Sequence, residues 1–114
     1  MLKRSAICLA AVLCFAALSP ARAGDPLTDQ ELLRLFPGTF RAVVKGKFQV
    51  KVTLKRDGAI LGEVPGLQDK GRWTVQNVEL CIVMPNMTRG RVECSSVVAA
   101  DGWYKGRNVV FQKL

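Results

Sequence analysis

Short segments that alternate between apolar and polar residues dominate this chain, and no helix-length segment separates one from the next. The clearest spans 47–55, with inward positions at Phe48, Val50, Val52 and Leu54. A period of two is typical of a strand with one buried and one solvated face. Because parallel strands need long crossover connections, strands joined by such short turns are expected to pair antiparallel.

The same alternation recurs along the rest of the chain, with turn residues such as Pro65-Gly66 and Asp101-Gly102 between the segments. A long meander usually closes into a barrel or curls, because this removes exposed strand edges. We therefore predict a mainly β fold. It is an antiparallel meander of seven to eight strands, in a small barrel or curled sheet, with one short N-terminal helix. The further strands are expected at about 60–64, 71–76, 80–84, 91–98, 103–105 and 108–112.

The predicted helix spans about 29–36. Thr28 and Glu31 form a capping box, in which each side chain accepts from the backbone N–H of the other residue. Pro37-Gly38 ends the helix. Its apolar face is expected to cover one end of the sheet.

Two registers compete at the turn Asp57-Gly58. A two-residue turn would place Glu63 in the core opposite Val52, whereas a three-residue loop pairs Leu54 with Ile60. A shift of one residue moves every side chain to the other face, so burial favours the second register. This register sets Lys51 opposite Glu63 on the solvated face.

The first 23 residues have the order of a secretory signal peptide. Lys3 and Arg4 precede an apolar run over 6–18, and small residues follow at 21–23. The run is shorter than the ~20 apolar residues that cross a bilayer. We predict cleavage after residue 23, a single β-rich domain over 24–114 with no transmembrane segment, and a periplasmic or secreted location.

Two kinds of anchor are the alternatives to cleavage. One is a retained membrane segment, and the other is lipid attachment at Cys14. The bulky Leu13 stands where a lipid-attachment signal has a small residue, and the apolar run continues past Cys14. We therefore favour a cleaved signal.

Cleavage removes Cys8 and Cys14 and leaves Cys81 and Cys94. Two cysteines in a small exported domain predict one disulfide, here between neighbouring antiparallel strands. A metal or redox role is weaker, because the spacing is not C-x-x-C and the chain has no histidine. The alternation places Cys81 on the face opposite Leu80, and whether that face is the core stays open.

The absence of histidine removes the usual general base and the commonest metal ligand. The acidic residues are scattered, and no pattern marks two of them as a catalytic pair. We predict that the protein is not an enzyme, with no catalytic residue, cofactor or metal site.

The formal net charge is +8, of which Lys3, Arg4 and Arg22 contribute three, so residues 24–114 carry about +5. This balance favours an anionic partner. The alternation of 47–55 predicts four lysines on the solvated face of one strand, as a candidate anion-binding ridge. Simple solvation is the competing interpretation. The four are Lys45, Lys47, Lys51 and Lys55.

Arginines offer a second cationic patch, at Arg89 and Arg91 together with Arg72 and Arg107. Arginine clusters bind carboxylates and phosphates through paired hydrogen bonds. The sequence gives no sign that these four meet, so we interpret them as scattered surface charge.

Trp73 and Trp103 are predicted to be core anchors, since a small barrel needs large side chains to fill it. A ligand cavity would need an interior that is not filled. Gly62 and Gly71 would leave space, but glycines in strands more often mark bulges or tight bends. We therefore expect a filled interior.

Several short motifs follow one another in a fixed order along the chain. They are Leu32-Leu33, Phe36-Pro37-Gly38, Asp57-Gly58, Gly71-x-Trp73, Leu80-Cys81, Cys94 and Asp101-Gly102-x-Tyr104. This order resembles a family of small exported bacterial proteins of unknown function. The resemblance covers nearly all of 24–114 and implies periplasmic residence without a known reaction. Such residues specify a fold more than an activity.

The first functional hypothesis is an exported, non-enzymatic binding or envelope-associated protein whose basic face meets an anionic lipid, glycan or protein. The alternative is a secreted protein-partner module, such as an enzyme inhibitor or accessory subunit, that uses the 85–90 loop or an exposed edge. Export argues against intracellular nucleic acid as the partner.

Mass spectrometry of the exported protein under non-reducing conditions tests the leader and the disulfide together. We expect a chain that begins at Gly24 and is two hydrogens lighter than its reduced form. An intact N-terminus with two free thiols would contradict both predictions.

Overall fold

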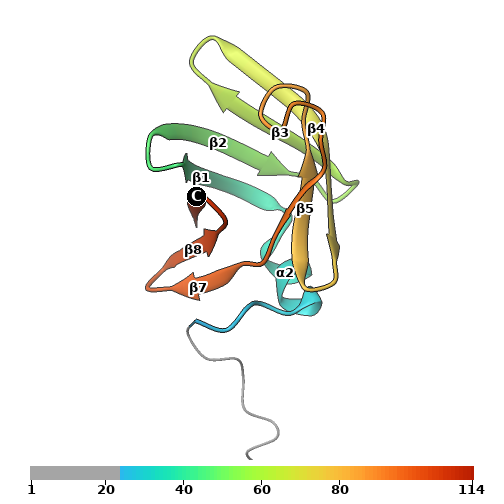
Figure 1. Ribbon diagram of the computed structural model, residues 1–114, viewed down its shortest axis with the longest axis vertical. Coiled ribbons are helices and arrows are strands. Elements are labelled where there is room, and N and C mark those ends of the chain that lie inside the picture. Colours follow the sequence, from blue (N-terminus) through green and yellow to red (C-terminus); the bar gives the residue numbers. More distant parts are fainter. Residues whose placement is uncertain (1–23) are drawn as a thin grey trace, which may run out of the picture.

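The computed structural model describes residues 24–114; the predicted signal peptide lies outside them. The described chain holds one helix and nine strands (Figure 1). In chain order they are α2 (Asp29–Leu35), β1 (Gly38–Val44), β2 (Phe48–Leu54), β3 (Ala59–Val64), β4 (Leu67–Gln76), β5 (Glu79–Val83), β6 (Glu93–Ser95), β7 (Val98–Ala100), β8 (Trp103–Gly106) and β9 (Val109–Lys113).

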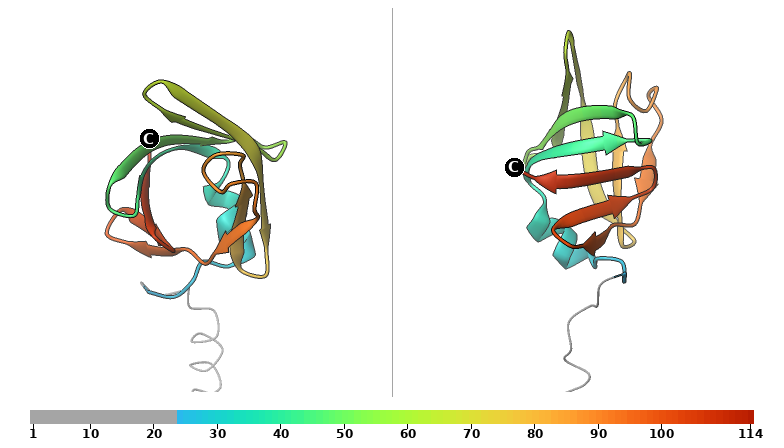
Figure 2. Two further views of the ribbon diagram at one scale, coloured as in Figure 1. Left: turned by 45° about the horizontal axis from the view of Figure 1, so that its top comes forward. Right: turned by 90° about the vertical axis from the view of Figure 1, so that its left-hand side faces the viewer.

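All nine strands form one antiparallel sheet in the order β6-β5-β4-β3-β2-β1-β9-β8-β7. The two edge strands, β6 and β7, follow each other in the chain and are separated only by Ser96 and Val97. The sheet must therefore curl until its two edges meet at this point. Figure 2 (left) shows the curled sheet from the end that carries the β3–β4 hairpin. The predicted mainly β, curled antiparallel sheet with one short helix is confirmed.

The predicted number of seven to eight strands is wrong, for two reasons. First, the sequence analysis predicts no strand at β1, although Phe40, Ala42 and Val44 occupy alternate positions there. Second, the single strand expected at 91–98 is two strands, because the chain pairs with β5 through β6 and with β8 through β7. Between them, the carbonyl of Val97 accepts instead from the N–H of Leu27, at 2.7 Å.

The register predicted from burial is confirmed. Leu54 lies opposite Ile60 and Lys51 opposite Glu63. The helix begins as expected, with a capping box in which Glu31 N–H donates to the Thr28 hydroxyl at 3.2 Å and Thr28 N–H donates to the Glu31 carboxylate at 3.0 Å. It ends at Leu35, one residue before the predicted end.

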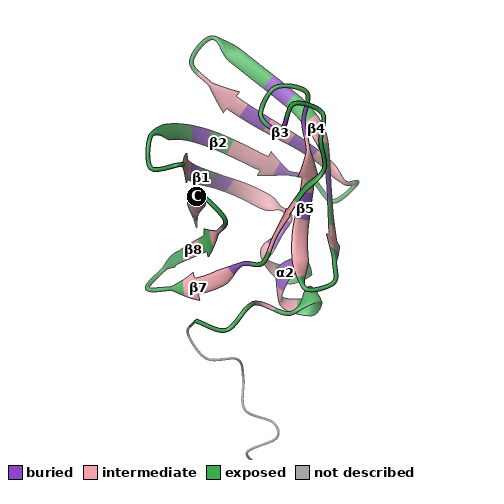
Figure 3. Cartoon of the chain, viewed as in Figure 1, coloured by how far each residue is buried: buried purple, intermediate pink, exposed green. Residues whose placement is uncertain are grey.

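Helix α2 covers one end of the curled sheet (Figures 2 and 3). Buried aromatic residues pack together at this end. The Phe36 ring, just after the helix, lies 5.1 Å from Phe40, 5.8 Å from Phe111 and 6.1 Å from Trp73, between ring centroids. Tilted and edge-on contacts at these distances are the favoured arrangements of aromatic rings. We refer to this end as the closed end.

Two predicted inward residues are exposed. Trp103 is 37% exposed, because Tyr104 takes the inward position and stacks on Phe111 at 5.5 Å. Phe48 is 59% exposed, because the pairing of β2 with β3 extends only to Lys51 and leaves this end of β2 uncovered. Trp73, by contrast, is buried as predicted, and its indole N–H donates to the Lys55 carbonyl at 2.8 Å.

The predicted disulfide joins Cys81 of β5 to Cys94 of β6, which lie directly opposite each other. Its two cysteines are 13 residues apart. Replacing both by alanine should lower the free energy of unfolding by about 3 kcal/mol, since the unfolded chain regains the entropy of an open loop. Urea denaturation of the double variant, compared with the oxidised native protein, measures this. A loss in the double variant below a few tenths of a kcal/mol would contradict the prediction.

Candidate functional site

A cavity of about 820 Å³ lies inside the curled sheet. Its floor is the aromatic cluster of the closed end, with Phe36, Phe40 and Phe111 among the residues that line it. Small side chains on β1 and β9, such as Ala42 and Val109, line the wall above these rings. Ligand sites in proteins commonly measure about 300–1,000 Å³ and are mostly apolar. The expectation of a filled interior is therefore wrong.

At the end of the sheet opposite to α2, the cavity is bordered by turns. Because the sheet is antiparallel, the β1–β2 turn, the β8–β9 turn and the 84–92 segment all fall at this end (Figure 2, right). Two of these turns touch, since the Lys45 N–H donates to the Asn108 carbonyl at 2.7 Å. We call this end the mouth.

Four cationic residues line the cavity, and all four come from the segments at the mouth: Lys45, Arg89, Arg91 and Arg107. Their side chains form no hydrogen bond or ion pair with any residue in the described part of the chain. Two cations nearer the closed end have hydrogen-bond partners. Arg72 donates to the Asp57 carbonyl at 3.2 Å, and the Lys113 ammonium donates to the Leu35 carbonyl at 3.3 Å.

Acidic residues gather at the opposite end of the molecule. Asp29 and Glu31 lie in α2, and Asp57 and Asp101 lie in the turns at the same end of the sheet. Cations such as Lys55, Arg72 and Lys113 balance them there, whereas the cavity lining at the mouth has four cations and one carboxylate. A mouth of one sign with low-dielectric walls attracts ligands of the opposite sign.

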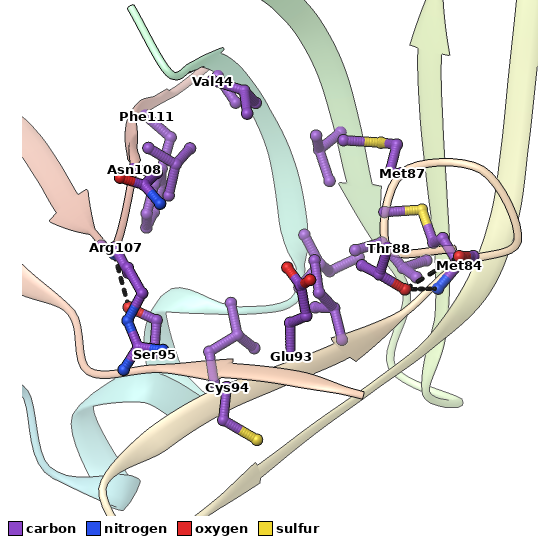
Figure 4. A pocket seen from close by; sticks show the side chains of 18 of the residues that line it. Val44, Met84, Met87, Thr88, Glu93, Cys94, Ser95, Arg107, Asn108 and Phe111 are labelled. Atoms are coloured by element: carbon purple, nitrogen blue, oxygen red, sulfur yellow. Dashed lines mark hydrogen bonds between the residues drawn. The ribbon is translucent and has the colours of Figure 1, made fainter. Parts of the chain in front are cut away.

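Strand β6 presents alternate residues to the two faces of the sheet. Figure 4 shows the Glu93 side chain pointing into the cavity and the Cys94 sulfur pointing away from it. The disulfide therefore lies on the outer face, which settles the question that the sequence left open. Ser95 points inward again, and its hydroxyl accepts from the Arg107 N–H at 2.7 Å.

The 85–90 loop is fastened to the sheet through Asp69 of β4, which is 3% exposed. The Asp69 carboxylate accepts from the backbone N–H of Met87 at 2.7 Å, and from the backbone and side-chain N–H groups of Asn86. The buried Thr88 hydroxyl donates to the Met84 carbonyl and accepts from the Met84 N–H, each at 2.9 Å. The loop is thus held in place at the mouth of the cavity.

The two strand glycines make room for this loop and not for a ligand. A Cβ on Gly62 would lie 2.9 Å from the Met87 sulfur, and one on Gly71 would collide with the Val83 carbonyl. Glycine at these positions allows the close approach of the chain segments that carry Met84 and Met87.

The predicted lysine ridge does not lie on one strand. Only Lys51 is within β2, where it pairs with Arg41 and Glu63 of the neighbouring strands. Lys45 and Lys47 lie in the turn at the mouth, whereas Lys55 lies beyond the other end of β2. Of these four lysines, Lys45 lines the cavity.

The arginines that seemed scattered are largely brought together. Arg89, Arg91 and Arg107 line the same cavity, whereas Arg72 lies at the other end. The sequence could not reveal this cluster, because it forms only when the β8–β9 turn and the 84–92 segment reach the same end of the sheet. The structural role of Asp69 was not predicted either. Nothing in the sequence around Asp69 indicates that its carboxylate binds the 85–90 loop.

No helix in residues 24–114 is both long and apolar enough to cross a bilayer. The same residues contain no group of three acidic or cysteine side chains placed to hold a metal ion. Comparison of the chain with protein families, curated proteins and solved structures gives no match.

Replacing Asp69 by alanine should release the 85–90 loop, because two backbone N–H groups lose a charged acceptor. We expect the free energy of unfolding to fall by about 2 kcal/mol, and the Met87 amide to exchange its hydrogen faster than in the native protein. Chemical denaturation and hydrogen exchange measure these effects. The matched control is Glu63→Gln on the neighbouring strand, and equal protection of Met87 in Asp69→Ala would contradict the account.

Proposed function

We propose that this protein is an exported, non-enzymatic binding protein that holds a small amphiphilic molecule with an anionic group. The observation that carries the proposal is the cavity of about 820 Å³, with an aromatic floor and four cations along its lining. The apolar part of the ligand would lie against the floor, and its anionic group would lie at the mouth. The export part of the proposal rests on the first 23 residues.

The apolar half of this ligand follows from the floor. Phe36 and Phe40 are only 1% exposed in the molecule as a whole, and Ala42 is almost as buried. An apolar chain in the cavity would remove its own surface, and that of partly buried wall residues such as Ile82 and Val109, from water, which contributes roughly 25 cal/mol per Å². A glycan or another fully polar ligand would gain little from such a floor.

The anionic half follows from the mouth. Lys45, Arg91 and Arg107 approach the cavity from three segments and have no protein partner among the described residues. A carboxylate or phosphate among them would gain charge-assisted hydrogen bonds, which are stronger than neutral ones. We therefore propose that the anionic group binds at the open end of the sheet, and not on the outer face of β2 as the sequence predicted.

A second candidate is a module that binds a partner protein through the 85–90 loop. The observation in its favour is the exposure of apolar residues near that loop, with Val92 65% exposed. This surface needs no occupant inside the cavity. The two candidates therefore respond differently to a change in the cavity wall.

Val44 of β1 points into the cavity near the mouth, as Figure 4 shows, whereas its neighbour Val43 faces the other side of the sheet. Val44→Phe should fill part of the cavity and weaken binding of dodecyl phosphate, a single-chain anion, by tenfold or more, about 1.4 kcal/mol. Isothermal titration calorimetry below the critical micelle concentration measures this affinity.

The matched control for this experiment is Val43→Phe, which adds the same volume outside the cavity and should bind as the native protein does. Thermal unfolding establishes that both variants fold. No binding by the native protein, or an equal loss in both variants, would contradict the proposal. If the protein binds a partner protein, and substitution of Val92 without any change in the cavity abolishes that binding, the second candidate is favoured.

A further inference from the structure

One residue of the cavity lining has a charge opposite to that of the four cations. Among the described residues that line the cavity, Glu93 is the only one with a carboxylate. This carboxylate points into the cavity in Figure 4. It forms no hydrogen bond or ion pair with any residue between 24 and 114, although four cations line the same cavity.

The position of Glu93 is fixed by the sheet and not by a flexible loop. It lies directly opposite Ile82 of β5, and the next residue, Cys94, is locked to β5 by the disulfide. Glu93 is exposed to solvent at the mouth of the cavity, so its carboxylate is accessible to a ligand.

We propose that Glu93 binds a cationic group of the ligand, so that the ligand is a zwitterionic amphiphile with a single apolar chain. This inference rests on the proposed function and names the class of its ligand. The anionic group of the head would lie among Lys45, Arg91 and Arg107, and an ammonium group next to it would contact Glu93. A phosphoethanolamine head group has both charges a few bonds apart.

A zwitterionic ligand and a simple anion differ in net charge, so their relative affinities distinguish the two ligand classes. The lining carries four cations and one carboxylate. Coulomb attraction alone therefore favours the ligand with the larger negative charge. A preference for the zwitterion therefore needs a favourable contact between its ammonium group and the Glu93 carboxylate.

Lysophosphatidylethanolamine and lysophosphatidic acid with the same acyl chain differ only in the ethanolamine group. The native protein should bind the first at least as tightly as the second, in calorimetry below the critical micelle concentrations. Glu93→Gln should weaken lysophosphatidylethanolamine binding by about tenfold, the effect of one charged contact. The same substitution should leave lysophosphatidic acid binding unchanged or make it tighter.

The control variant is Glu63→Gln, which removes a carboxylate that pairs with Lys51 in the register of β2 and β3; it should change neither affinity. If Glu93→Gln changes both affinities by the same factor, or if the native protein prefers lysophosphatidic acid, the role of Glu93 is wrong while the proposed function stands. If neither lipid binds the native protein, the proposed function fails as well.

Discussion

Phe36 packs its ring against aromatic side chains from strands that are far apart in the sheet. Its partners Trp73 and Phe111 belong to β4 and β9, which have β3, β2 and β1 between them in the sheet order. A flat sheet could not bring both rings within about 6 Å of one side chain, because neighbouring strands are already about 4.8 Å apart. The helix end therefore acts as the centre around which the sheet curls.

This packing occurs at one end only, which gives the molecule its polarity. The rings and α2 fill the closed end, and the wall above them continues with smaller side chains such as Ala42 and Val109. The antiparallel order then sends alternate turns to the other end. Those turns contain the cations Lys45 and Arg107, whereas the acidic residues of α2 lie at the closed end. One arrangement thus produces both the cavity and the charge at its mouth.

Features that depend on neighbouring residues could be predicted from the sequence. The capping box at Thr28 follows from residues three positions apart, and the pairing of Leu54 with Ile60 follows from one turn and the burial pattern around it. The facing of Cys81 and Cys94 follows from a single hairpin. Each of these needs only local geometry and the cost of exposing apolar residues.

Features that depend on curvature could not be predicted in the same way. Strand β1 was missed because its inward residues include the small Ala42, which weakens the alternation. The alternation at 103–104 does not tell which of Trp103 and Tyr104 points inward, since both are aromatic. The hollow interior and the grouping of Arg89, Arg91 and Arg107 depend on how far the sheet curls, a property set by contacts between distant strands.

The central claim is that the inside of the curled sheet is a binding site. Methyl NMR of the protein during titration with a single-chain lysophospholipid tests it most directly. We expect saturable shifts of the methyl signals of Ile82, Met84 and Val44, which line the cavity, while those of the exposed Leu33 and Leu67 stay in place. Shifts confined to the exposed methyls, with the interior signals unchanged, would contradict the account.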